Sequence, residues 1–529
     1  MLHETAYYTR MTRGVYRYLR TPPVSDVEGM IRGQLENRES AWLDTVRRVV
    51  FANPANPFHR LFHLAGCTYQ DLAETVRRDG LEATLAALHR QGVYLTHQEF
   101  KGRAPIVRSG QHIPSDGRSF SNPLVKGLME TVSSGSRSPG TRTRQGIPYR
   151  VYCEAYALLT QRELDLAGRP YCLLWPILPS EAGFLSGFTR SRLKHRVERW
   201  FTIGGTLQES GHYWMMTEFL VLFSRLMGVR IPFPSRLPPN DFSPVAEWLA
   251  RRSLQGVRSV VATYVSPAAR VAAAALERGL DLRGTLFQVT GETLTGAKRA
   301  LIERAGAEVF PFYWISELGP IGYSCRQMRT GNCVHLFRDA LAVIGHPRQA
   351  PLSDVQVNSL LFTTLLPFAP HVLINVEMDD SGVIEPAGCD CLFTRAGLTE
   401  QIRDISSFGK LTGQGMTLVG TDLVRILEET LPARFGGHPG DYQLVEQEGP
   451  AQTQLRLHVS PRVLRSSPQA VRDCFLQEIR RFHGGALAAR VWRHTEALEV
   501  VQAEPLTTST GKVLPLHLLG AGAEHRQDP

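Results

Sequence analysis

Short apolar runs alternate with segments of helical length between residues 259 and 312, and this alternation constrains the fold more than any other feature of the chain. Three apolar runs predict buried strands: Ser259–Tyr264, Thr285–Thr290 and Glu308–Phe312. The segments between them predict two helices, one that opens at Pro267 and ends near Gly279, and one at Thr295–Ala305. Strands that alternate with helices of this length form a parallel sheet covered by helices. The predicted fold class is therefore α/β.

The length of the chain predicts more than one domain, because 529 residues are too many for one simple core. Three early segments carry apolar residues at helical spacing: Ser25–Asn37, Tyr69–Asp79 and Leu81–Gln91. Gly409–Gly420 holds four glycines in twelve residues and predicts a hinge, so we place a domain boundary near Lys410. We expect a mostly helical region at 1–107 packed on the large domain, a large domain with helix-covered, largely parallel sheets at 108–410, a small mobile α+β domain at 411–517 and a flexible tail at 518–529.

The segment after the hinge predicts a compact βαββ unit. Polar and apolar residues alternate at Gln454–Val459, as in a half-buried strand. Ser467 and Pro468 predict the start of a helix that runs to about His483. Two further strands are predicted at Ala489–Trp492 and Ala497–Val501.

The distribution of charge argues against nucleic acid as a partner. Lysine and arginine number 59 against 50 acidic residues, which gives a net charge of +9. The arginines are spread along the chain without a long basic block, as on an Arg-rich surface, and some of this charge is expected to face an anionic substrate. A basic nucleic-acid-binding protein stays open as a rival interpretation. We find no apolar run of signal-peptide or membrane-spanning type, so we expect a cytoplasmic protein without a membrane span.

A run of small residues from Ser133 to Thr141 has the composition of a phosphate-binding loop. Small residues let the backbone curl, so that amide N–H groups and hydroxyls can wrap phosphate oxygens. Arg137 and Arg142 could add charge. The run does not match a Walker P-loop, which needs Gly-Lys-Ser/Thr after a four-residue spacer. A flexible Ser/Gly surface loop is the alternative.

Polar and aromatic residues follow two of the predicted strands. Gly291 and Glu292 come after the second strand, and Tyr313-Trp314-Ile315-Ser316-Glu317 comes after the third. Ligands of such sheets bind at the carboxyl ends of the strands. There an aromatic ring can stack on a purine, a hydroxyl can hold a phosphate and a carboxylate can hold Mg²⁺. The alternative is a strand-end loop whose tyrosine and tryptophan belong to the core.

A Thr-Gly-Lys sequence stands near the end of the C-terminal unit, where Thr507–Val513 contains Gly511 and Lys512. A lysine after glycine in a polar loop presents an ammonium group on a flexible stem. Such a group suits the neutralisation of a carboxylate and a phosphate as they react. A solvated surface lysine is the alternative.

The order and spacing of these segments resemble the adenylate-forming superfamily, and within it the phenylacetate–CoA ligase branch, over residues 108–516. The resemblance implies a loop over the ATP β- and γ-phosphates that includes Ser133, Ser134, Gly135, Ser136, Arg137, Gly140 and Thr141. It implies that Gly291 and Glu292 line the adenine pocket and that Tyr313 stacks on adenine. Ser316 would contact phosphate and Glu317 would ligate Mg²⁺. Asp379 would hold the ribose hydroxyls, and Lys512 would bridge the carboxylate and the α-phosphate. For Asp379, a turn aspartate is the alternative, since Asp-Asp-Ser-Gly is typical of turns.

Several positions depart from the family pattern. The phosphate loop has arginines and no lysine, and Trp314 fills a place usually taken by glycine, which would narrow the nucleotide or acyl pocket. Val376-Glu377-Met378-Asp379 stands where the family has Arg-Thr-Gly-Asp. The nearest match to the family hinge is Gly409-Lys410, or Arg403-Asp404 just upstream.

Four cysteines fall in one third of the chain: Cys325, Cys333, Cys389 and Cys391. In a cytosolic protein such a cluster indicates a metal before a disulfide. The resemblance implies that Cys325, His335, Cys389 and Cys391 hold a structural Zn²⁺ as a closed tetrahedral set. Cys333 competes with Cys325 or His335 for a place in this set. A group of unpaired buried thiols is the alternative.

The function implied by the resemblance is activation of a small carboxylic acid with ATP and Mg²⁺ through an acyl-AMP, followed by transfer to a thiol. CoA is the expected acceptor, and an acyl-carrier protein or an amine is the alternative. Aromatic residues in the expected acyl region indicate an aryl or arylalkyl acid: His212, Tyr213, Trp214, Phe219, Phe287 and Trp314. A non-catalytic member that binds nucleotide or acyl groups is the rival from another class, and a homodimer is the expected assembly.

Overall fold

The computed structural model describes residues 2–116, 118–126, 129–132, 142–178, 180, 182–203, 207–238, 240–328, 331–349, 356–407, 412–413, 416–417, 420–447, 454–463, 467–481, 492, 498–508 and 511–519. The predicted phosphate loop at Ser133–Thr141 and the hinge residue Lys410 lie outside these residues.

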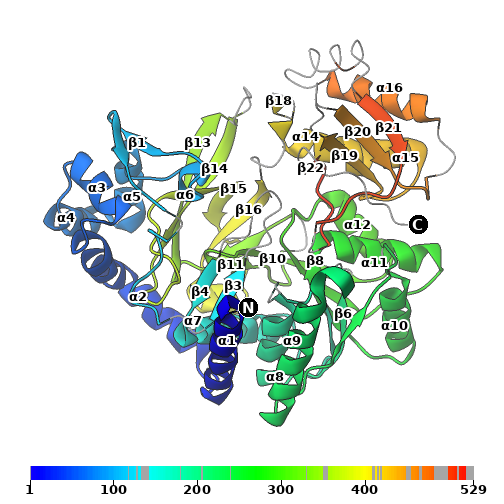
Figure 1. The fold of residues 1–529 in the computed structure, drawn as a ribbon, viewed down its shortest axis with the longest axis horizontal. Helices are drawn as coiled ribbons and strands as arrows, with labels where there is room; N and C mark the ends of the chain where they lie inside the picture. The colour runs from blue at the N-terminus through cyan, green and yellow to red at the C-terminus, as the bar shows by residue number, and fades with distance from the viewer. Residues whose placement is uncertain are drawn as a thin grey trace.

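A twelve-stranded sheet runs through the large N-terminal part of the molecule (Figure 1). One half of it is parallel, in the order β7 (Pro234–Arg236), β6 (Val197–Thr202), β5 (Tyr171–Leu174), β8 (Val260–Tyr264), β9 (Leu286–Thr290) and β10 (Glu308–Ile315). The three predicted strands are β8, β9 and β10, and they pair in parallel as expected. Every residue of β8 and β9 is buried, which explains why both read as continuous apolar runs. The α/β class predicted from the sequence is confirmed.

Helices cover both faces of the parallel half. One face packs on α10 (Ser243–Leu254), α11 (Val265–Glu277) and α12 (Gly296–Arg304), and the other on α1 (Leu2–Arg20), α8 (Ala182–Arg192) and α9 (Leu207–Leu226). Alternate residues of β5 belong to the two cores, since Cys172 packs with the first set of helices and Leu173 with the second. The helices predicted between β8 and β10 are α11 and α12. The first begins at Val265, so Pro267 lies inside its first turn.

The other half of the sheet is antiparallel, in the order β11 (Gly319–Tyr323), β12 (Val334–Leu336), β16 (Glu400–Ser407), β15 (Val376–Pro386), β14 (Gln356–Thr364) and β13 (Leu341–Gln349). Strand β10 joins the halves, because it pairs in parallel with β9 and antiparallel with β11. It continues to Ile315, three residues beyond the predicted end at Phe312. Tyr313 and Trp314 were expected in a strand-end loop, but the hairpin with β11 gives their backbone a partner and keeps them in the strand.

The N-terminal residues form helices that share a core with the antiparallel half. These are α2 (Val27–Val46) with its π-helical extension η1 (Arg47–Phe51), α3 (Pro57–Leu64), α4 (Tyr69–Asp79), α5 (Leu81–Arg90) and the short α6 (His97–Phe100). They pack with α7 (Ile147–Glu163), and α13 (Leu392–Arg395) packs against the same helix. Two short hairpins follow α6: β1 (Ile106–Arg108) with β2 (Gln111–Ile113), and β3 (Met129–Val132) with β4 (Arg142–Gln145). The three helices predicted early in the chain are α2, α4 and α5.

The C-terminal residues form a smaller unit with its own hydrophobic core. After a small hairpin of β17 (Thr412–Gly413) and β18 (Met416–Thr417) come α14 (Gly420–Arg425), the π-helix η2 (Ile426–Thr430) and α15 (Leu431–Phe435). A four-stranded sheet follows, in the order β21 (Leu498–Gln502), β20 (Gln454–Val459), β19 (Tyr442–Gln447) and β22 (Leu516–Leu519), with α16 (Pro468–Ile479) packed on it. Helix α16 ends four residues before the predicted His483, and 489–491 of the predicted strand Ala489–Trp492 lie outside the described residues. Within the described ranges, no helix combines the length and the apolar character needed to cross a bilayer.

Candidate active site

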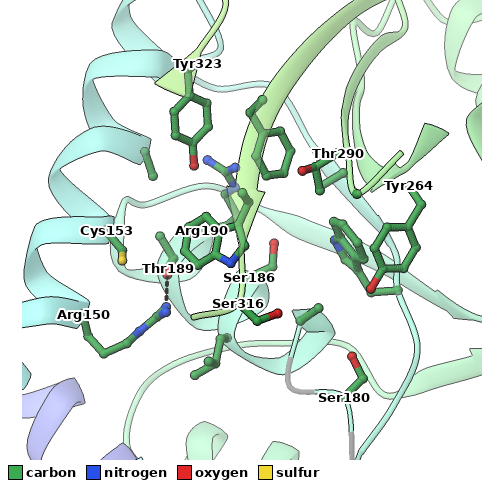
Figure 2. Close-up of a pocket in the computed structure, with 18 of the residues that line it drawn as sticks. Arg150, Cys153, Ser180, Ser186, Thr189, Arg190, Tyr264, Thr290, Ser316 and Tyr323 are labelled. Atoms are coloured by element: carbon green, nitrogen blue, oxygen red, sulfur yellow. Dashed lines mark hydrogen bonds between the residues drawn. The ribbon is translucent and has the colours of Figure 1, made fainter. Parts of the chain in front are cut away.

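A cavity of about 210 Å³ lies at the carboxyl ends of the parallel strands (Figure 2). We name it the inner cavity. Phe312 and Trp314 of β10, with Ser316 just after the strand, form one wall. The other walls come from α7, α8 and the ends of β8 and β9, and include Arg150, Cys153, Trp175, Leu185, Ser186, Thr189, Arg190, Ala262, Tyr264, Thr290 and Gly291. Lys512 of the C-terminal unit also lines this cavity.

A second cavity lies between the large part and the C-terminal unit. We name it the seam cavity. Its volume is about 310 Å³, and its lining residues include Gly291, Glu292, Lys298, Ser406, Ser407, Glu428 and Val513–Leu516. Gly291 borders both cavities, and its φ of +79° is a conformation that favours glycine. The two predicted adenine-pocket residues therefore lie beside the seam cavity.

Lys512 reaches the inner cavity from a tight loop. Thr507 bridges to Val513, Gly511 has a φ of +82°, and the Lys512 backbone N–H donates to Thr508 Oγ1 at 3.1 Å. The Lys512 ammonium lies 4.4 Å from the centroid of the Tyr264 ring and 3.0 Å from the position that a Cβ on Gly291 would take. A larger residue at 291 would therefore crowd the lysine.

Contacts on either side of this loop join the two parts of the chain. The Ser266 hydroxyl at the start of α11 lies 3.4 Å from the carbonyl oxygen of Val513. In η2, Glu428 forms a buried ion pair with Lys298 of α12 at 2.8 Å and accepts a hydrogen bond from Thr295 Oγ1 at 2.5 Å. These contacts place the C-terminal unit so that Lys512 faces the inner cavity.

Glu317 is buried at the turn after β10 and forms an ion pair with Lys101, the residue that follows α6. Its backbone carbonyl lies 3.0 Å from Nδ1 of His371. Burial alone would raise the pKa of Glu317, but the charge and hydrogen bond of Lys101 outweigh it and the pKa lies below its usual range. The predicted Mg²⁺ ligand is thus ionised and already faces a cation of the protein.

Asp379 and Tyr313 lie outside the walls of the inner cavity. Oδ2 of Asp379 is 2.6 Å from Nδ1 of His97, and Asp379 has a φ of +60°, which is uncommon for a residue with a side chain. The Tyr313 hydroxyl donates to Oδ2 of Asp380 at 2.7 Å. Ser407, which lines the seam cavity, donates to the carbonyl oxygen of Asp379 at 3.1 Å. Glu292 accepts from the backbone N–H and the hydroxyl of Ser266, at 2.8 and 2.5 Å.

The structure thus separates the predicted site residues into groups. Ser316 and Lys512 meet at the inner cavity, Gly291 and Glu292 border the seam cavity, and Glu317, Tyr313 and Asp379 contact side chains elsewhere in the protein. The predicted loop residues Ser133, Ser134, Gly135, Ser136, Arg137, Gly140 and Thr141, with Lys410, lie outside the described residues.

Sequence reasoning missed two side chains that reach these carboxylates, His97 and Lys101. Their only local signal is the capping box of α6, in which Thr96 and Glu99 exchange hydrogen bonds. This motif predicts a helix start, and it carries no information about partners more than 200 residues away.

The cysteine cluster gathers the four predicted zinc ligands. Cys325, His335, Cys389 and Cys391 offer ligand atoms that all lie within 4.8 Å of one another. The ten-residue spacing between Cys325 and His335 has a simple origin, because β11 and β12 form an antiparallel pair in which His335 lies opposite Tyr323. Cys333 is not a member of the group that the described residues form.

The distances within this cluster fit a tetrahedral metal. Sγ of Cys389 lies 3.8 Å from Sγ of Cys325 and 3.7 Å from Sγ of Cys391. Zn–S bonds of about 2.3 Å in a regular tetrahedron place sulfur atoms about 3.8 Å apart. Nε2 of His335 lies 3.4 and 3.2 Å from the sulfurs of Cys389 and Cys391. The hydrogen bond with Cys325 and the neighbouring His335 lower the pKa of Cys391 to about 3, so it is already the thiolate that binds metal.

No family model matches the chain, and no curated protein matches it by sequence. The fold is similar to that of 2-hydroxyisobutyryl-CoA ligase, crystallised in a postadenylation state in complex with 2-HIB-AMP. The TM-score is 0.55 at 14% sequence identity, over 95% of this chain and 91% of that chain. The same enzyme with R3-HIB-AMP gives a TM-score of 0.52 at 15% identity, over 95% and 91% of the two chains. At this identity the likeness shows the fold alone: an α/β part with a large sheet, followed by a smaller C-terminal part.

Proposed function

We propose that this protein is an adenylate-forming ligase, which joins a carboxylic acid to AMP and releases pyrophosphate. The observation that carries the proposal is Lys512. It comes from a separate C-terminal unit and lines a cavity at the strand ends together with Ser316. A fold shared with a CoA ligase that was crystallised with an acyl-AMP adds support.

In the first step, a carboxylate oxygen of the acid attacks the α-phosphorus of ATP, and the bond to the pyrophosphate oxygen breaks. Negative charge spreads over the phosphoryl oxygens as this happens. Lys512 neutralises it from the mouth of the inner cavity, and Ser316 donates a hydrogen bond from the β10 wall. Tyr264, Trp175 and Trp314 are apolar neighbours that exclude water from the reacting groups.

The nucleotide is assigned to the side of the sheet that carries the seam cavity. Gly291 and Glu292 border that cavity, and Ser407 ties its wall to Asp379. We assign Asp379 to the ribose hydroxyls and Tyr313 to the adenine ring. Both assignments require these residues to leave the partners that they have here, His97 and Asp380. The loop at Ser133–Thr141 is assigned to the β- and γ-phosphates.

Mg²⁺ is assigned to Glu317, where Lys101 already supplies positive charge. Oxygen ligands suit this ion, and Mg²⁺ supplies charge neutralisation at the phosphates. In this arrangement Lys101 either moves aside when Mg²⁺ binds or shares the carboxylate with it.

In the second step, the small unit turns about the segment near Lys410, withdraws Lys512 and admits a thiol. We assign CoA as the acceptor. A carrier-protein thiol or an amine is the variant of the same chemistry. The acyl group then leaves AMP for the sulfur.

The cysteine cluster is assigned to a structural Zn²⁺. Three sulfurs and one imidazole nitrogen fill four coordination positions, so the ion would have no open position for substrate. Its role would be to tie the hairpin of β11 and β12 to the segment before α13.

A second candidate is a non-catalytic member of the same fold that binds a nucleotide or an acyl group. One observation favours it: Lys101 and His97 already pair with Glu317 and Asp379, two of the assigned ligands. Such a protein would bind ATP or an acid but would not exchange pyrophosphate.

Acid-dependent exchange of labelled pyrophosphate into ATP tests the proposal and separates the two candidates. We expect exchange with at least one acid in a panel of aryl, arylalkyl and aliphatic acids, and a loss of more than about 100-fold in Lys512→Ala. Lys194→Ala is the control, because Lys194 is exposed and away from both cavities. Binding of ATP without exchange for any acid would favour the non-catalytic candidate. Full exchange in Lys512→Ala would remove Lys512 from its role.

A further inference from the structure

A buried arginine of α8 lines the inner cavity without a carboxylate partner. Arg190 is 7% exposed, and its Nη2 donates to Oε1 of Gln288 at 3.1 Å. Its Nε and Nη1 find no hydrogen-bond acceptor in the described part of the chain. A buried guanidinium normally has an anion or a full set of acceptors, because an unpaired charge is expensive to bury. Arg190, whose side chain lines the cavity, therefore keeps two donors that no described residue uses.

The groups around Arg190 do not neutralise it. No carboxylate of the described residues lies within ion-pair distance of its guanidinium, which instead packs 4.8 Å from the centroid of the Tyr171 ring. Burial and the charge of Arg190 lower the pKa of the nearby His195 to about 3, so that ring is neutral. Burial also raises the pKa of Tyr323, another lining residue, so its hydroxyl stays protonated. Neither of these neighbours offers a negative charge to Arg190.

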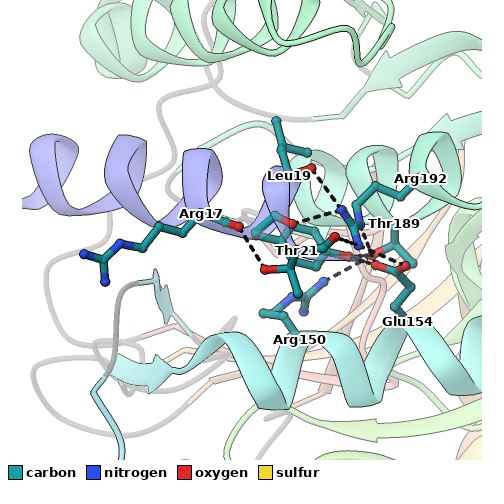
Figure 3. A network of polar contacts seen from close by, with 8 residues as sticks. Arg17, Leu19, Thr21, Arg150, Glu154, Thr189 and Arg192 are labelled. Atoms are coloured by element: carbon teal, nitrogen blue, oxygen red, sulfur yellow. Dashed lines mark hydrogen bonds and ion pairs between the residues drawn. The ribbon is translucent and has the colours of Figure 1, made fainter. Parts of the chain in front are cut away.

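The next arginine on the same helix shows what a satisfied guanidinium looks like in this fold (Figure 3). Arg192 pairs with Glu154 at 2.7 Å and donates to the backbone carbonyls of Tyr18, Leu19 and Thr21. Glu154 also accepts from the hydroxyl of Tyr18 at 2.6 Å. The carboxylate of Glu154 is therefore committed to Arg192 and leaves the positive charge of Arg190 uncompensated.

A second buried arginine lines the same cavity from α7. Arg150 is 4% exposed and donates to Oγ1 of Thr189 at 3.3 Å, as the dashed line in Figure 2 marks. Arg150 therefore adds a second buried guanidinium to the lining of this cavity.

The position of Arg190 sets it apart from the end of the cavity that Lys512 lines. Arg190 is bonded to Gln288 of β9, whereas Lys512 lies beside Gly291, three residues further along the chain. At about 3.3 Å per residue along a strand, the positions of Gln288 and Gly291 are roughly 10 Å apart. Phe312, Trp314 and Ala262 line the cavity on the strands around these positions, so apolar surface separates the two ends.

We propose that Arg190 binds a second carboxylate of the substrate, so that the acid to be activated is a dicarboxylic acid with an apolar middle. A guanidinium and a carboxylate match in planar geometry and can form two parallel hydrogen bonds. This inference rests on the proposed acid activation, and it adds the substrate class. One carboxyl group reacts near Lys512, and the other is held at Arg190.

Matched pairs of acids test the substrate class. The probes are suberic acid, sebacic acid and 4-carboxyphenylacetic acid, each compared with its monomethyl ester, in which the distal carboxylate is masked. For wild type we expect kcat/KM for pyrophosphate exchange to favour at least one diacid over its ester by about 10- to 100-fold. The ratio of diacid to ester is an internal measure within each variant, so it does not depend on the overall activity of that variant.

Two variants assign the preference to the guanidinium. Arg190→Gln removes the charge. Arg190→Met also removes it but keeps an apolar stem against Tyr171, and it serves as the second variant if Arg190→Gln fails to fold. In both variants we expect the ratio of kcat/KM for diacid to that for ester to fall towards one. Arg283→Gln is the matched control, because Arg283 is 82% exposed, and it should keep the wild-type ratio.

A binding measurement without ATP separates this proposal from the proposed activity. We expect a preferred diacid to raise the thermal midpoint of wild type and to have no such effect on Arg190→Gln or Arg190→Met. If that pattern holds while no acid supports exchange, the anion subsite stands and the ligase function falls. A wild-type ratio near one for every pair, or a ratio that survives in a folded Arg190 variant, overturns the subsite.

Discussion

The ion pair between Lys101 and Glu317 is the contact whose removal has the most definite consequence. Glu317 is 5% exposed and Lys101 17%, so both charges are largely out of water. Lys101→Met keeps the length of the side chain and removes the ammonium group. The carboxylate of Glu317 then stays buried without that cation, and burial raises its pKa instead of being outweighed.

The size of the effect follows from the burial of the pair. Removing one partner of a buried ion pair costs about 3–5 kcal/mol. Because the lost cation favours the ionised carboxylate, the same change raises the pKa of Glu317. In wild type the pKa of Glu317 is lowered, so its stabilisation is fully present above the unfolded pKa of about 4.3 and is lost only as pH falls below that value. In Lys101→Met the pKa of the buried Glu317 is raised, so the sign of the pH dependence reverses and stability falls as pH rises above about 4.3.

Thermal unfolding in EDTA between pH 5 and 8 measures this directly. We expect the midpoint of Lys101→Met to drop more steeply with rising pH than the midpoint of wild type or of the exposed control Lys194→Met. Mg²⁺ with ATP should restore the thermal midpoint of Lys101→Met. The Mg²⁺ concentration for half-maximal pyrophosphate exchange should fall by tenfold or more in this variant, because Lys101 no longer competes for Glu317. A midpoint equal to that of wild type at pH 8, with an unchanged Mg²⁺ requirement, would refute the reasoning.

Three further perturbations have defined outcomes. Elemental analysis should show that Cys389→Ser and Cys391→Ser each lose bound zinc, and both variants should unfold at lower temperature than wild type. Cys333→Ser should keep the metal, since Cys333 is outside the cluster. Wild-type protein that is folded and free of metal would contradict the site. Lys298→Met leaves Glu428 buried without its lysine. The rate of adenylation should therefore fall more than tenfold, while the rate of thiol transfer from supplied acyl-AMP is retained. An equal loss of rate in both half-reactions would show a general defect. Asp339, which accepts from Tyr156, has its pKa raised by burial from 3.8 to about 7, so it binds a proton in the folded state that the unfolded chain releases between these values. Stability should therefore fall by about 4 kcal/mol as pH rises from 4 to 8, and Asp339→Asn should flatten this dependence; a variant with the wild-type pH profile of thermal unfolding would refute it.

The parallel half of the sheet could be predicted because its signals are local. Strands β8 and β9 are buried on both faces and therefore read as continuous apolar runs. The helices between them are marked by Pro267 near the start of α11 and by glycines after the ends of both helices. Strand β20 also carries a local signal, because polar and apolar residues alternate along it, although the polar His458 is buried as well.

The electrostatic partners of the candidate site could not be predicted, because they are set by tertiary contacts. Lys101 and Glu317 are 216 residues apart, and neither carries a local mark of the other. Tyr313 was expected to point at a ligand, but its hydroxyl contacts Asp380. The pairing of β10 with β11 shifts register between Tyr313 and Trp314. Arg190 also escaped notice, since one arginine in an arginine-rich chain shows its burial only after α8 has packed.

The zinc ligands lie between these cases. Cys389 and Cys391 form a pair that is visible in the sequence, whereas Cys325 and His335 stand ten residues apart and carry no local signal of their proximity. The hairpin of β11 and β12 brings these two together, because cross-strand neighbours can be many residues apart along the chain.

Transfer of oxygen-18 from the acid to AMP tests the central claim most directly. If the carboxylate attacks the α-phosphorus and a thiol then displaces AMP at the acyl carbon, one carboxylate oxygen stays on the phosphorus. An acid that supports exchange, labelled in both carboxylate oxygens, should give AMP with one oxygen-18 and unlabelled pyrophosphate, and Lys512→Ala should give almost none. Unlabelled AMP, or ADP with labelled orthophosphate, would contradict acyl-AMP formation by this protein.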